Sequence, residues 1–426
     1  MAEKSIPALM APARQRDNPL TRSVAGICGM VVLAILVLAC VGTLPWTLGT
    51  PAGENQARYE QGTLAGALLP PAWAPHDETE QAQLRRFAEL RATEEIVRAD
   101  PDAIDHPAPT EEQIRASTPR PLFGTDKLGR DLFIRCLTGG GISIGIGIAA
   151  AAISVVIGTL YGALAAYIGG RVDALLMRIV DVLYGLPYIL LVVLLAVAGD
   201  AIVSEMTTKQ AARQKWMEEQ TVLVLQSEGQ TDATRTTARE ALDIRSDLQR
   251  ELRDRLEQEI DAGRLPRLKP TELSPGQRKA LEVGILLVAI GGVSWLTMAR
   301  VVRGQVLSLK AQPFMEAARA MGVPGWRQFL LHLLPNLLGP IIVYATLTVP
   351  QAILQESFLS FLGIGVQEPL PSWGNLAADG LKELNTIKTR WWLLLFPCVL
   401  LATTLLALNF VGEGLREAFD PKRSRN

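Results

Sequence analysis

The chain has 426 residues, of which 49% are hydrophobic and 20% are charged, and its formal net charge at pH 7 is −1. A near-neutral chain lacks the strongly basic surface of nucleic-acid-binding proteins, so we expect no nucleic-acid partner. The apolar residues are concentrated in long uncharged runs, which excludes an ordinary soluble domain. The four cysteines and three histidines show no metal-ligand spacing, so we expect no metal site.

Six uncharged runs have about the length that crosses a bilayer, for which a helix needs roughly 17–25 apolar residues. The runs are Val24–Leu44, Ile142–Ile168, Val182–Gly199, Val283–Ala299, Leu337–Gln355 and Trp391–Val411. Backbone within lipid satisfies its hydrogen bonds as helix. We therefore predict an all-α, polytopic membrane protein with six transmembrane helices.

These runs divide the chain into spans, tails and loops. The predicted segments are a tail at 1–23, helix 1 at 24–44, an extracytoplasmic insertion at 45–141, helices 2 and 3 within 142–199, a charged helical insertion at 200–282, helix 4 at 283–299, a cytoplasmic loop at 300–336, helix 5 at 337–362, an extracytoplasmic loop at 363–390, helix 6 at 391–411 and a tail at 412–426.

The orientation follows from lysine and arginine in short loops, which favour the cytoplasmic side. With a cytoplasmic N-terminus, four segments lie inside: 1–22, 169–181, 300–336 and 412–426. They hold four, two, five and four lysine and arginine residues, respectively. The short outside loop 363–390 holds three. Long loops translocate largely regardless of charge. We therefore expect both termini to be cytoplasmic.

Charged residues flank the second and third spans. Asp126, Arg130 and Asp131 precede the second span, where we expect them to cap a turn; the alternative is that they face incoming substrate. Arg178 and Asp181 are three residues apart at the start of the third span. Residues at this spacing meet on one helical face, so we expect them to pair.

The second span itself carries a ridge of small residues. Ser154, Gly158, Gly162 and Ala166 follow one another at four-residue intervals, which places them along one side of a helix. Small side chains let helices approach closely in a membrane. We interpret the ridge as packing within this chain, with a seam to a second membrane subunit as the alternative.

The insertion 200–282 contains a narrow apolar stripe. Leu248, Leu252, Leu256 and Ile260 recur every four residues on one helical face. The stripe indicates either a helical hairpin or a helix lying on another surface. A solvated helix without a partner fits the same pattern.

The stretch "ELSPGQRKA" at Glu272–Ala280 resembles the signature sequence of ATP-binding-cassette (ABC) ATPases. The chain has no Gly-x-x-x-x-Gly-Lys-Ser/Thr loop to hold nucleotide phosphates, so we reject that interpretation. We expect a helix start instead, with Ser274 as the N-cap and Pro275 in the first turn.

The loop ahead of the fifth span contains an amphipathic segment. Phe314, Ala317, Ala318 and Met321 fall on one face of a helix. Gly322 ends that face, as glycine commonly does at a helix terminus. We therefore expect a first short helix that stops at a glycine bend.

Pro324 then starts a second helix whose apolar face has the same spacing. That face consists of Trp326, Phe329, Leu330 and Leu333. We expect a second short helix that ends near Pro335, ahead of the fifth span. Two such helices either rest on lipid headgroups or dock into a groove of a soluble partner. The small side chains of Ala317 and Ala318 favour docking, because they permit close approach.

The fifth span ends with two polar residues, Gln355 and Glu356. A carboxylate at membrane depth is costly and by default suggests a role in a transport pathway, so both residues are candidates for lining it. Glu356 lies 19 residues beyond Leu337, close to the outer interface, where water lowers the cost. A self-sufficient channel or secondary transporter would need ionisable residues or half-helices at mid-membrane, and the uncharged spans argue against it.

Several motifs resemble one family. Glu316-Ala317-Ala318, Gly322, His332 and Leu334-Pro335 are spaced as in the EAA loop of ABC importer permeases, which usually have isoleucine where His332 stands. The stretches "FGTDKLGRDLF" and "ESFLSFLGIGVQEPLPSWGN" are similar to its peptide-importer branch. The chain thus resembles the C-type permease of dipeptide, oligopeptide and nickel importers. Its two insertions are departures, because such permeases usually have shorter outside loops.

The resemblance implies a multi-pass subunit of a bacterial plasma (inner) membrane importer that forms half of the translocation pathway. Its implied partners are membrane lipid, a second homologous permease, two ATPase subunits and an extracytoplasmic substrate-binding protein. ATP hydrolysis would belong to the ATPase, so we expect no catalytic residue and no bound cofactor in this chain. Peptides are the expected cargo, with nickel or another small solute as the alternative. The ATPase-coupling residues would be Glu316, Ala317, Ala318, Gly322 and Pro335.

Overall fold

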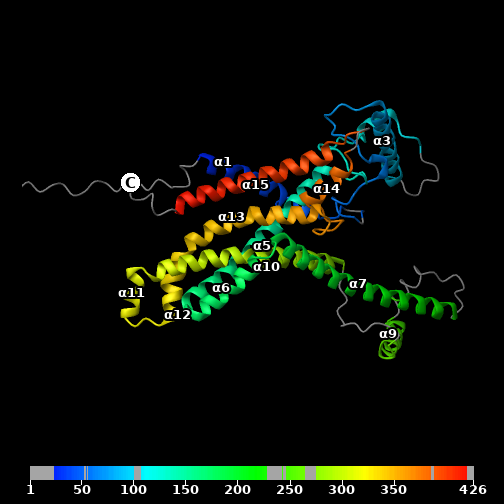
Figure 1. The fold of residues 1–426 in the computed structure, drawn as a ribbon. Helices are drawn as coiled ribbons and strands as arrows, with labels where there is room; N and C mark the ends of the chain where they lie inside the picture. The colour runs from blue at the N-terminus through cyan, green and yellow to red at the C-terminus, as the bar shows by residue number, and fades with distance from the viewer. Residues whose placement is uncertain are drawn as a thin grey trace, which may run out of the picture. The chain divides into compact units, whose positions relative to one another are not determined.

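The computed structural model describes residues 24–51, 54, 56–99, 107–227, 242, 246–263, 275–384 and 388–419. Within these ranges the chain is helical and contains no strand, only isolated bridges such as that between Thr125 and Asp131 (Figure 1). The all-α prediction is therefore confirmed.

Six of the described helices are long and apolar enough to cross a membrane, as predicted. They are Val24–Thr47, Leu132–Ile168, Tyr188–Glu205, Ala280–Lys310, Gly325–Phe361 and Trp392–Ala418. The second and fifth helices begin well before the uncharged runs from which they were predicted, Ile142–Ile168 and Leu337–Gln355. Charge alone therefore underestimates these two helices, because a helix continues through Arg135 and Arg327 without interruption.

The chain divides into two compact units, residues 1–192 with 287–426 and residues 193–286. Unit 1 contains α1 (Val24–Cys40), α2 (Leu44–Thr47), η2 (Leu64–Gly66), α3 (Glu78–Ala99), α4 (Glu111–Ala116), α5 (Leu132–Ile168), α6 (Gly170–Tyr184), α11 (Pro313–Ala320), α12 (Gly325–Arg327), η3 (Gln328–Leu333), α13 (Leu334–Phe361), α14 (Trp373–Lys382) and α15 (Trp392–Phe419). Unit 2 contains α9 (Ser246–Asp261). The helices α7 (Tyr188–Ser227) and α10 (Pro275–Lys310) contribute to both units.

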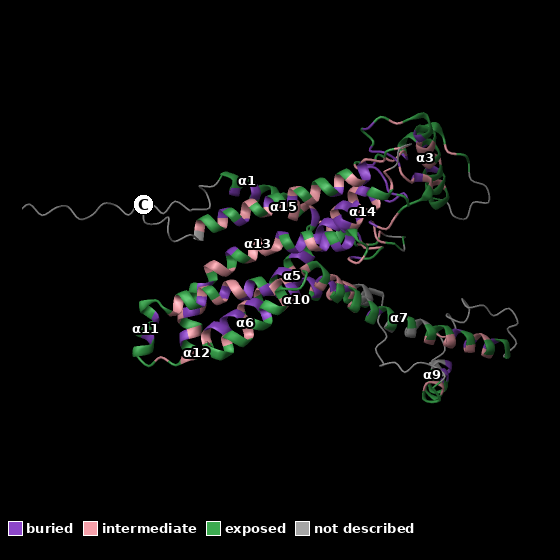
Figure 2. Ribbon diagram, in the orientation of Figure 1, coloured by how far each residue is buried: buried purple, intermediate pink, exposed green. Residues whose placement is uncertain are grey.

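α5 is the central helix of unit 1, and Figure 2 shows buried residues along much of its length. A Cβ added at Gly158 would lie 2.5 Å from Met298 Cβ, and one added at Gly162 would lie 2.2 Å from the carbonyl oxygen of Ala299. Glycine is therefore required for this close approach of α5 to α10. The ridge of small residues packs within the chain, as we interpreted it.

Interhelical ion pairs hold α6 against α10. Asp173 accepts two hydrogen bonds from Arg303, at 2.6 Å and 2.7 Å, and this interaction lowers the pKa of the Asp173 carboxyl. Asp181 pairs with Arg300 at 2.9 Å. The predicted pair of Arg178 with Asp181 is wrong, because the neighbouring helix offers Asp181 a partner that sequence spacing does not reveal.

The first insertion is folded. Ala88 and Ala92 of α3 pack with Ile114 of α4, and Thr125 ties the segment together by donating to the Gly66 carbonyl at 2.6 Å. α3 and α11 lie at opposite ends of unit 1 (Figure 1). This insertion therefore forms a structured cap at the end of the helices that is remote from α11.

In the second insertion, α7 continues as one helix of 40 residues, well beyond the length needed to cross a bilayer. The apolar stripe on α9 is buried, since Leu248, Leu252 and Leu256 are at most 3% exposed. The solvated-helix interpretation is therefore wrong, and the packed alternative is confirmed. The predicted N-cap Ser274 lies outside the described residues.

Candidate functional site

The bend after α11 is a well-formed helix terminus. Gly322 has φ +72°, its N–H donates to Arg319 O at 3.0 Å, and Val323 N–H donates to Ala318 O at 3.1 Å. These two bonds with a left-handed glycine define a Schellman motif, which satisfies the last carbonyls of the helix. The prediction that Gly322 ends the first amphipathic helix is therefore confirmed.

The buried side of α11 differs from the predicted face. Met315 is 0% exposed and Ala318 is 1% exposed. Met315 joins a core formed with residues of α5, α10, η3 and α13: Ala163, Ala166, Met298, Val302, Val306, Leu333 and Leu337. Full burial of a methionine side chain stabilises by about 1.5–3 kcal/mol, so α11 is held firmly against the bundle.

The rest of the predicted face is turned outward. Phe314 is 40% exposed and Met321 is 74% exposed, and Glu316 and Ala317 are also exposed. The sequence did not distinguish the side of α11 that packs on the bundle, because two apolar stripes overlap at Ala318 and the core contains the stripe with Met315. The outward stripe leaves apolar and acidic groups accessible together.

The second amphipathic segment is not a separate helix. It continues from Gly325 to Phe361 without interruption, so the prediction of a break near Pro335 was wrong. The residues just before this proline form a π-helical turn, Gln328–Leu333. A π turn is wider than an α turn, and it accommodates a residue that cannot donate a hydrogen bond. The Asn336 side chain donates to the His332 carbonyl at 2.6 Å in the same region.

The start of this long helix is fixed to the end of α5. Lys310 Nζ donates to the carbonyls of Ala166 at 2.9 Å and Tyr167 at 3.0 Å, where a cation is favourable because helix C-terminal carbonyls lack partners. The Tyr167 ring lies 6.1 Å from that of Phe329. A Cβ added at Gly325 would lie 2.3 Å from Tyr167 Oη. The segment from α11 to α13 is therefore one anchored unit.

A cavity of about 490 Å³ lies among α6, α7, α10 and α13. Tyr188 donates to Gln355 Oε1 at 2.7 Å and shares a hydrogen bond of 2.8 Å with Ser294. The lining combines these groups with Leu183, Tyr184, Leu186, Leu296, Thr297, Met298, Tyr344, Leu347, Thr348 and Gln351. None of the lining residues carries a charge at neutral pH. Gln355, a predicted pathway residue, therefore lies in an uncharged, largely apolar cavity that contains a few polar groups.

Glu356 is placed differently from its neighbour. It is 0% exposed and does not line the cavity, so the expected relief by interfacial water is wrong. Ser360 Oγ donates to it at 2.7 Å and Ser357 Oγ lies 3.3 Å away. Ser143 of α5 and Ser372 before α14 also interact with the carboxyl. Hydroxyl groups from three elements thus replace water around Glu356.

A buried ion network precedes α5. Asp126 accepts from Arg130 Nε and Arg135 Nη1, both at 2.7 Å, and from the backbone N–H groups of Leu128 and Arg130, both at 2.9 Å. Asp131 caps α5 by accepting from Phe133 N–H at 2.8 Å. The capping interpretation of Asp126, Arg130 and Asp131 is confirmed. The role of Arg135 was missed, although its position nine residues after Asp126 inside an apolar helix was a signal.

Most of the sequence matches known transport proteins. The family described as "Binding-protein-dependent transport system inner membrane component" matches residues 154–425. The oligopeptide transport system permease protein OppC of Haemophilus influenzae is 37% identical over 301 residues, which cover 71% of this chain and 70% of that protein. The dipeptide transport system permease protein DppC of Bacillus subtilis is 36% identical over 303 residues, covering 71% and 69%.

The oligopeptide transport system permease protein OppC of Escherichia coli is 39% identical over 300 residues, which cover 70% of this chain and 72% of that protein. These matches agree with the six membrane-crossing helices of the structure. The chain therefore belongs to the family of binding-protein-dependent transport system inner membrane components.

Proposed function

We propose that this chain is the permease subunit of an ATP-driven importer of di- or oligopeptides and forms half of its translocation pathway. Its relatives are oligopeptide and dipeptide transport permeases, which supports a peptide cargo. The uncharged cavity around Gln355, which is largely apolar with a few polar groups, also fits a peptide. A peptide with free termini carries both charges, and a cavity with fixed charge of either sign would bind one terminus too strongly to release it.

We also propose that this chain couples to the ATPase through the bend at Gly322, called the hinge below. The supporting observation is that a single helix runs from this hinge to the cavity. The helix Gly325–Phe361 begins three residues after Gly322 and carries Gln351 and Gln355, which line the cavity. Its 37 residues span about 55 Å at 1.5 Å per residue. A displacement of α11 would therefore reach the cavity through a rigid element.

The partner of α11 in this proposal is a separate ATPase subunit. The outward stripe of Phe314, Ala317 and Met321 offers an apolar surface, and Glu316 adds an acidic group at its edge. An amphipathic helix recognised in a groove uses this combination. Nucleotide binding can move the helix only if the ATPase contacts this stripe differently in its two states.

The proposal extends to orientation and assembly. Both termini and α11 face the cytoplasm, as the lysine and arginine distribution predicts. A second homologous permease completes the pathway, and an extracytoplasmic binding protein delivers the peptide. No hydrolytic chemistry is required of this chain, since ATP is hydrolysed by the partner.

The test is reconstitution of the chain in proteoliposomes with the products of its neighbouring transport genes. ATP-dependent uptake of a radiolabelled tripeptide, dependent on the binding protein, is the expected result. If the reconstituted transporter takes up labelled nickel but not the tripeptide, the cargo is the metal ion and the peptide proposal is wrong. Uptake by the chain alone, driven by an ion gradient without ATPase, would contradict the proposal and identify a secondary transporter.

A further inference from the structure

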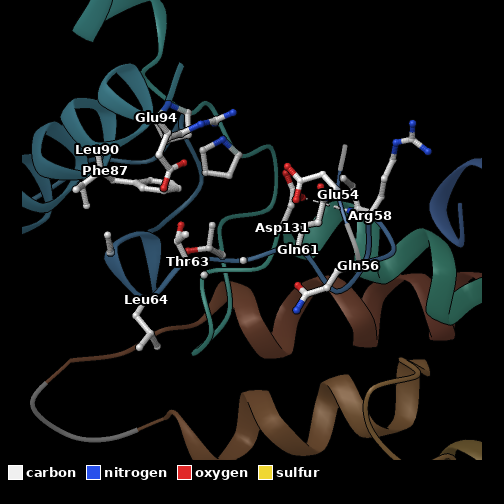
Figure 3. Close-up of a pocket in the computed structure, with 18 of the residues that line it drawn as sticks. Glu54, Gln56, Arg58, Gln61, Thr63, Leu64, Phe87, Leu90, Glu94 and Asp131 are labelled. Carbon is white, nitrogen blue, oxygen red and sulfur yellow. Dashed lines mark hydrogen bonds between the residues drawn. The ribbon is translucent and has the colours of Figure 1, made fainter. Parts of the chain in front are cut away.

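A second cavity of about 770 Å³ lies in the first insertion, between η2, α3 and the start of α5. Figure 3 shows Leu64, Phe87 and Leu90 on one side of it, and Asp131 on the other. It shares no lining residue with the cavity around Gln355. Its volume lies within the range of roughly 300–1,000 Å³ that small-molecule sites occupy.

One wall of this cavity is apolar and fixed in shape. Phe87 and Leu90 are three residues apart on α3 and therefore share a helical face. A Cβ added at Gly66 would lie 2.6 Å from the Phe87 ring, so the η2 backbone packs directly on the ring. Leu90 remains 52% exposed. The wall therefore offers a preformed contact for an apolar side chain.

Several charged groups of the lining already have partners. Arg98 pairs with Glu54 at 2.9 Å, and Arg58 donates to the Trp46 carbonyl at 2.7 Å. These groups are engaged by the protein itself. They therefore contribute to the shape of the cavity more than to its capacity to bind a charged ligand.

Other charged groups of the lining are available. Among the described residues, Arg91 and Arg120 form no salt bridge, and the Arg91 guanidinium lies 5.9 Å from the centre of the Phe87 ring. Stacking of this kind orients a guanidinium while leaving its N–H groups accessible. The two arginines give the cavity a cationic region next to its apolar wall.

Glu94 and Asp131 supply the opposite charge in the lining. Asp131 Oδ1 accepts the capping hydrogen bonds of Phe133 and Ile134, and Asp131 Oδ2 accepts none from a described residue. Burial raises the pKa of the Asp131 carboxyl. A bound cation would oppose that shift, because an adjacent positive charge favours the ionised form.

We propose that this cavity binds a short peptide through its two free termini. The ammonium group lies against Asp131, the carboxylate lies against Arg91 and Arg120, and an apolar side chain packs on Phe87 and Leu90. These groups match a peptide with free termini. The arginines recognise its carboxylate, the Asp131 carboxylate recognises its ammonium group, and the apolar wall contacts a side chain. The inference rests on the proposed peptide cargo, and it adds a peptide site outside the pathway.

The test uses the purified full-length chain in phosphatidylcholine nanodiscs, without ATPase. The probe is an equimolar mixture of tetrapeptides with free termini, and the peptides retained after gel filtration are counted by mass spectrometry. A second mixture has the same sequences with acetylated N-termini and amidated C-termini. We expect at least tenfold greater retention of the free peptides, because capping removes both charge interactions.

Two variants of the cavity and one matched control locate the site. Leu90→Trp fills the cavity from a half-exposed position, and Arg91→Gln removes the cation; each is expected to lower retention at least tenfold. Arg86→Gln removes an arginine of the same helix that does not line the cavity. This control is expected to retain peptides like the parent protein.

Three outcomes would overturn the inference. Equal retention of capped and free peptides would show that the termini are not recognised. Full retention by both Leu90→Trp and Arg91→Gln would place the peptide elsewhere, such as the Gln355 cavity. Loss of retention when phosphatidylethanolamine replaces phosphatidylcholine would assign the cavity to a lipid headgroup. ATP-dependent uptake by the assembled transporter is measured separately, so failure of this site is distinguishable from failure of the proposed function.

Discussion

Replacement of Asp126 by asparagine isolates the buried ion network as a source of stability. The side chains of Arg130 and Arg135 are 6% and 1% exposed, and both donate to Asp126 Oδ2. The amide of Asp126→Asn can keep its oxygen toward the backbone N–H groups. It then presents an N–H donor group to two guanidinium donors, so both cations lose their acceptor.

The magnitude follows from burial. Removing one partner of a buried ion pair costs about 3–5 kcal/mol, because it leaves an uncompensated buried charge. Glu368 lies 3.4 Å from Arg130 Nη2 and 3.9 Å from Arg135 Nη2, but its side chain is 45% exposed. Its compensation is therefore small, and we expect a loss near the lower end, about 3 kcal/mol.

Asp379→Asn is the matched control. Asp379 lies 3.2 Å from Lys382 and 3.6 Å from Lys127, and its side chain is 28% exposed. Ion pairs with exposed lysines contribute at most about 1 kcal/mol. Both variants change one carboxylate to an amide at the same end of unit 1, so they differ mainly in the burial of their partners.

The assay is the apparent melting temperature of each purified variant in one detergent. For one protein, the shift is close to the change in free energy divided by the unfolding entropy, so the two shifts can be compared directly. We expect Asp126→Asn to lower the melting temperature about three times as far as Asp379→Asn. The double variant Asp126→Asn with Arg135→Met should recover part of the loss, since it removes a buried charge. Equal shifts for the two single variants would refute the argument.

Three further predictions address the hinge, the topology and pH. Gly322→Val should abolish ATP-dependent peptide uptake, whereas Gly322→Asn should retain it. A left-handed φ costs a residue with a Cβ about 1–2 kcal/mol, and asparagine tolerates this conformation best. Uptake of peptide into proteoliposomes is measured for both variants. Cysteines at Ser227 and at the exposed Met321, in a cysteine-free background, should react with an impermeant thiol reagent in intact cells at 227 only, and the reverse pattern would invert the topology. The Asp173 pKa is lowered by Arg303, so Asp173→Asn should destabilise above about pH 4 and lose its effect as pH falls below that value, in melting curves against pH.

The sequence predicted features that depend on composition along one helix. Long uncharged runs gave the six membrane-crossing helices, because length and apolarity decide that property locally. Gly322 was recognised as a helix end because a left-handed residue is most often glycine. Gly158 and Gly162 were recognised as packing residues because small side chains at one spacing have few other uses in a membrane helix.

Features that depend on neighbouring helices were missed. The side of α11 that packs on the bundle was not predicted, because its sequence contains two apolar stripes and only the core around Met315 distinguishes them. Asp181 was assigned to Arg178 because its actual partner, Arg300, is far away in sequence. The continuity through Pro335 was missed because a π-helical turn leaves no signal in composition.

The long helix Gly325–Phe361 is held at both of its ends. Near its C-terminus, Ser360 Oγ donates to the Glu356 carboxyl at 2.7 Å, and a Cβ added at Gly374 would lie 2.2 Å from the Ser357 carbonyl oxygen, so α14 packs directly on the α13 backbone. At its N-terminus, a Cβ added at Gly325 would lie 2.3 Å from Tyr167 Oη of α5, and Leu333 is 0% exposed. Met315 of α11 packs in the same core as Leu333. A displacement of α11 would therefore have to carry the start of the long helix and the end of α5 with it, because these three elements share one core.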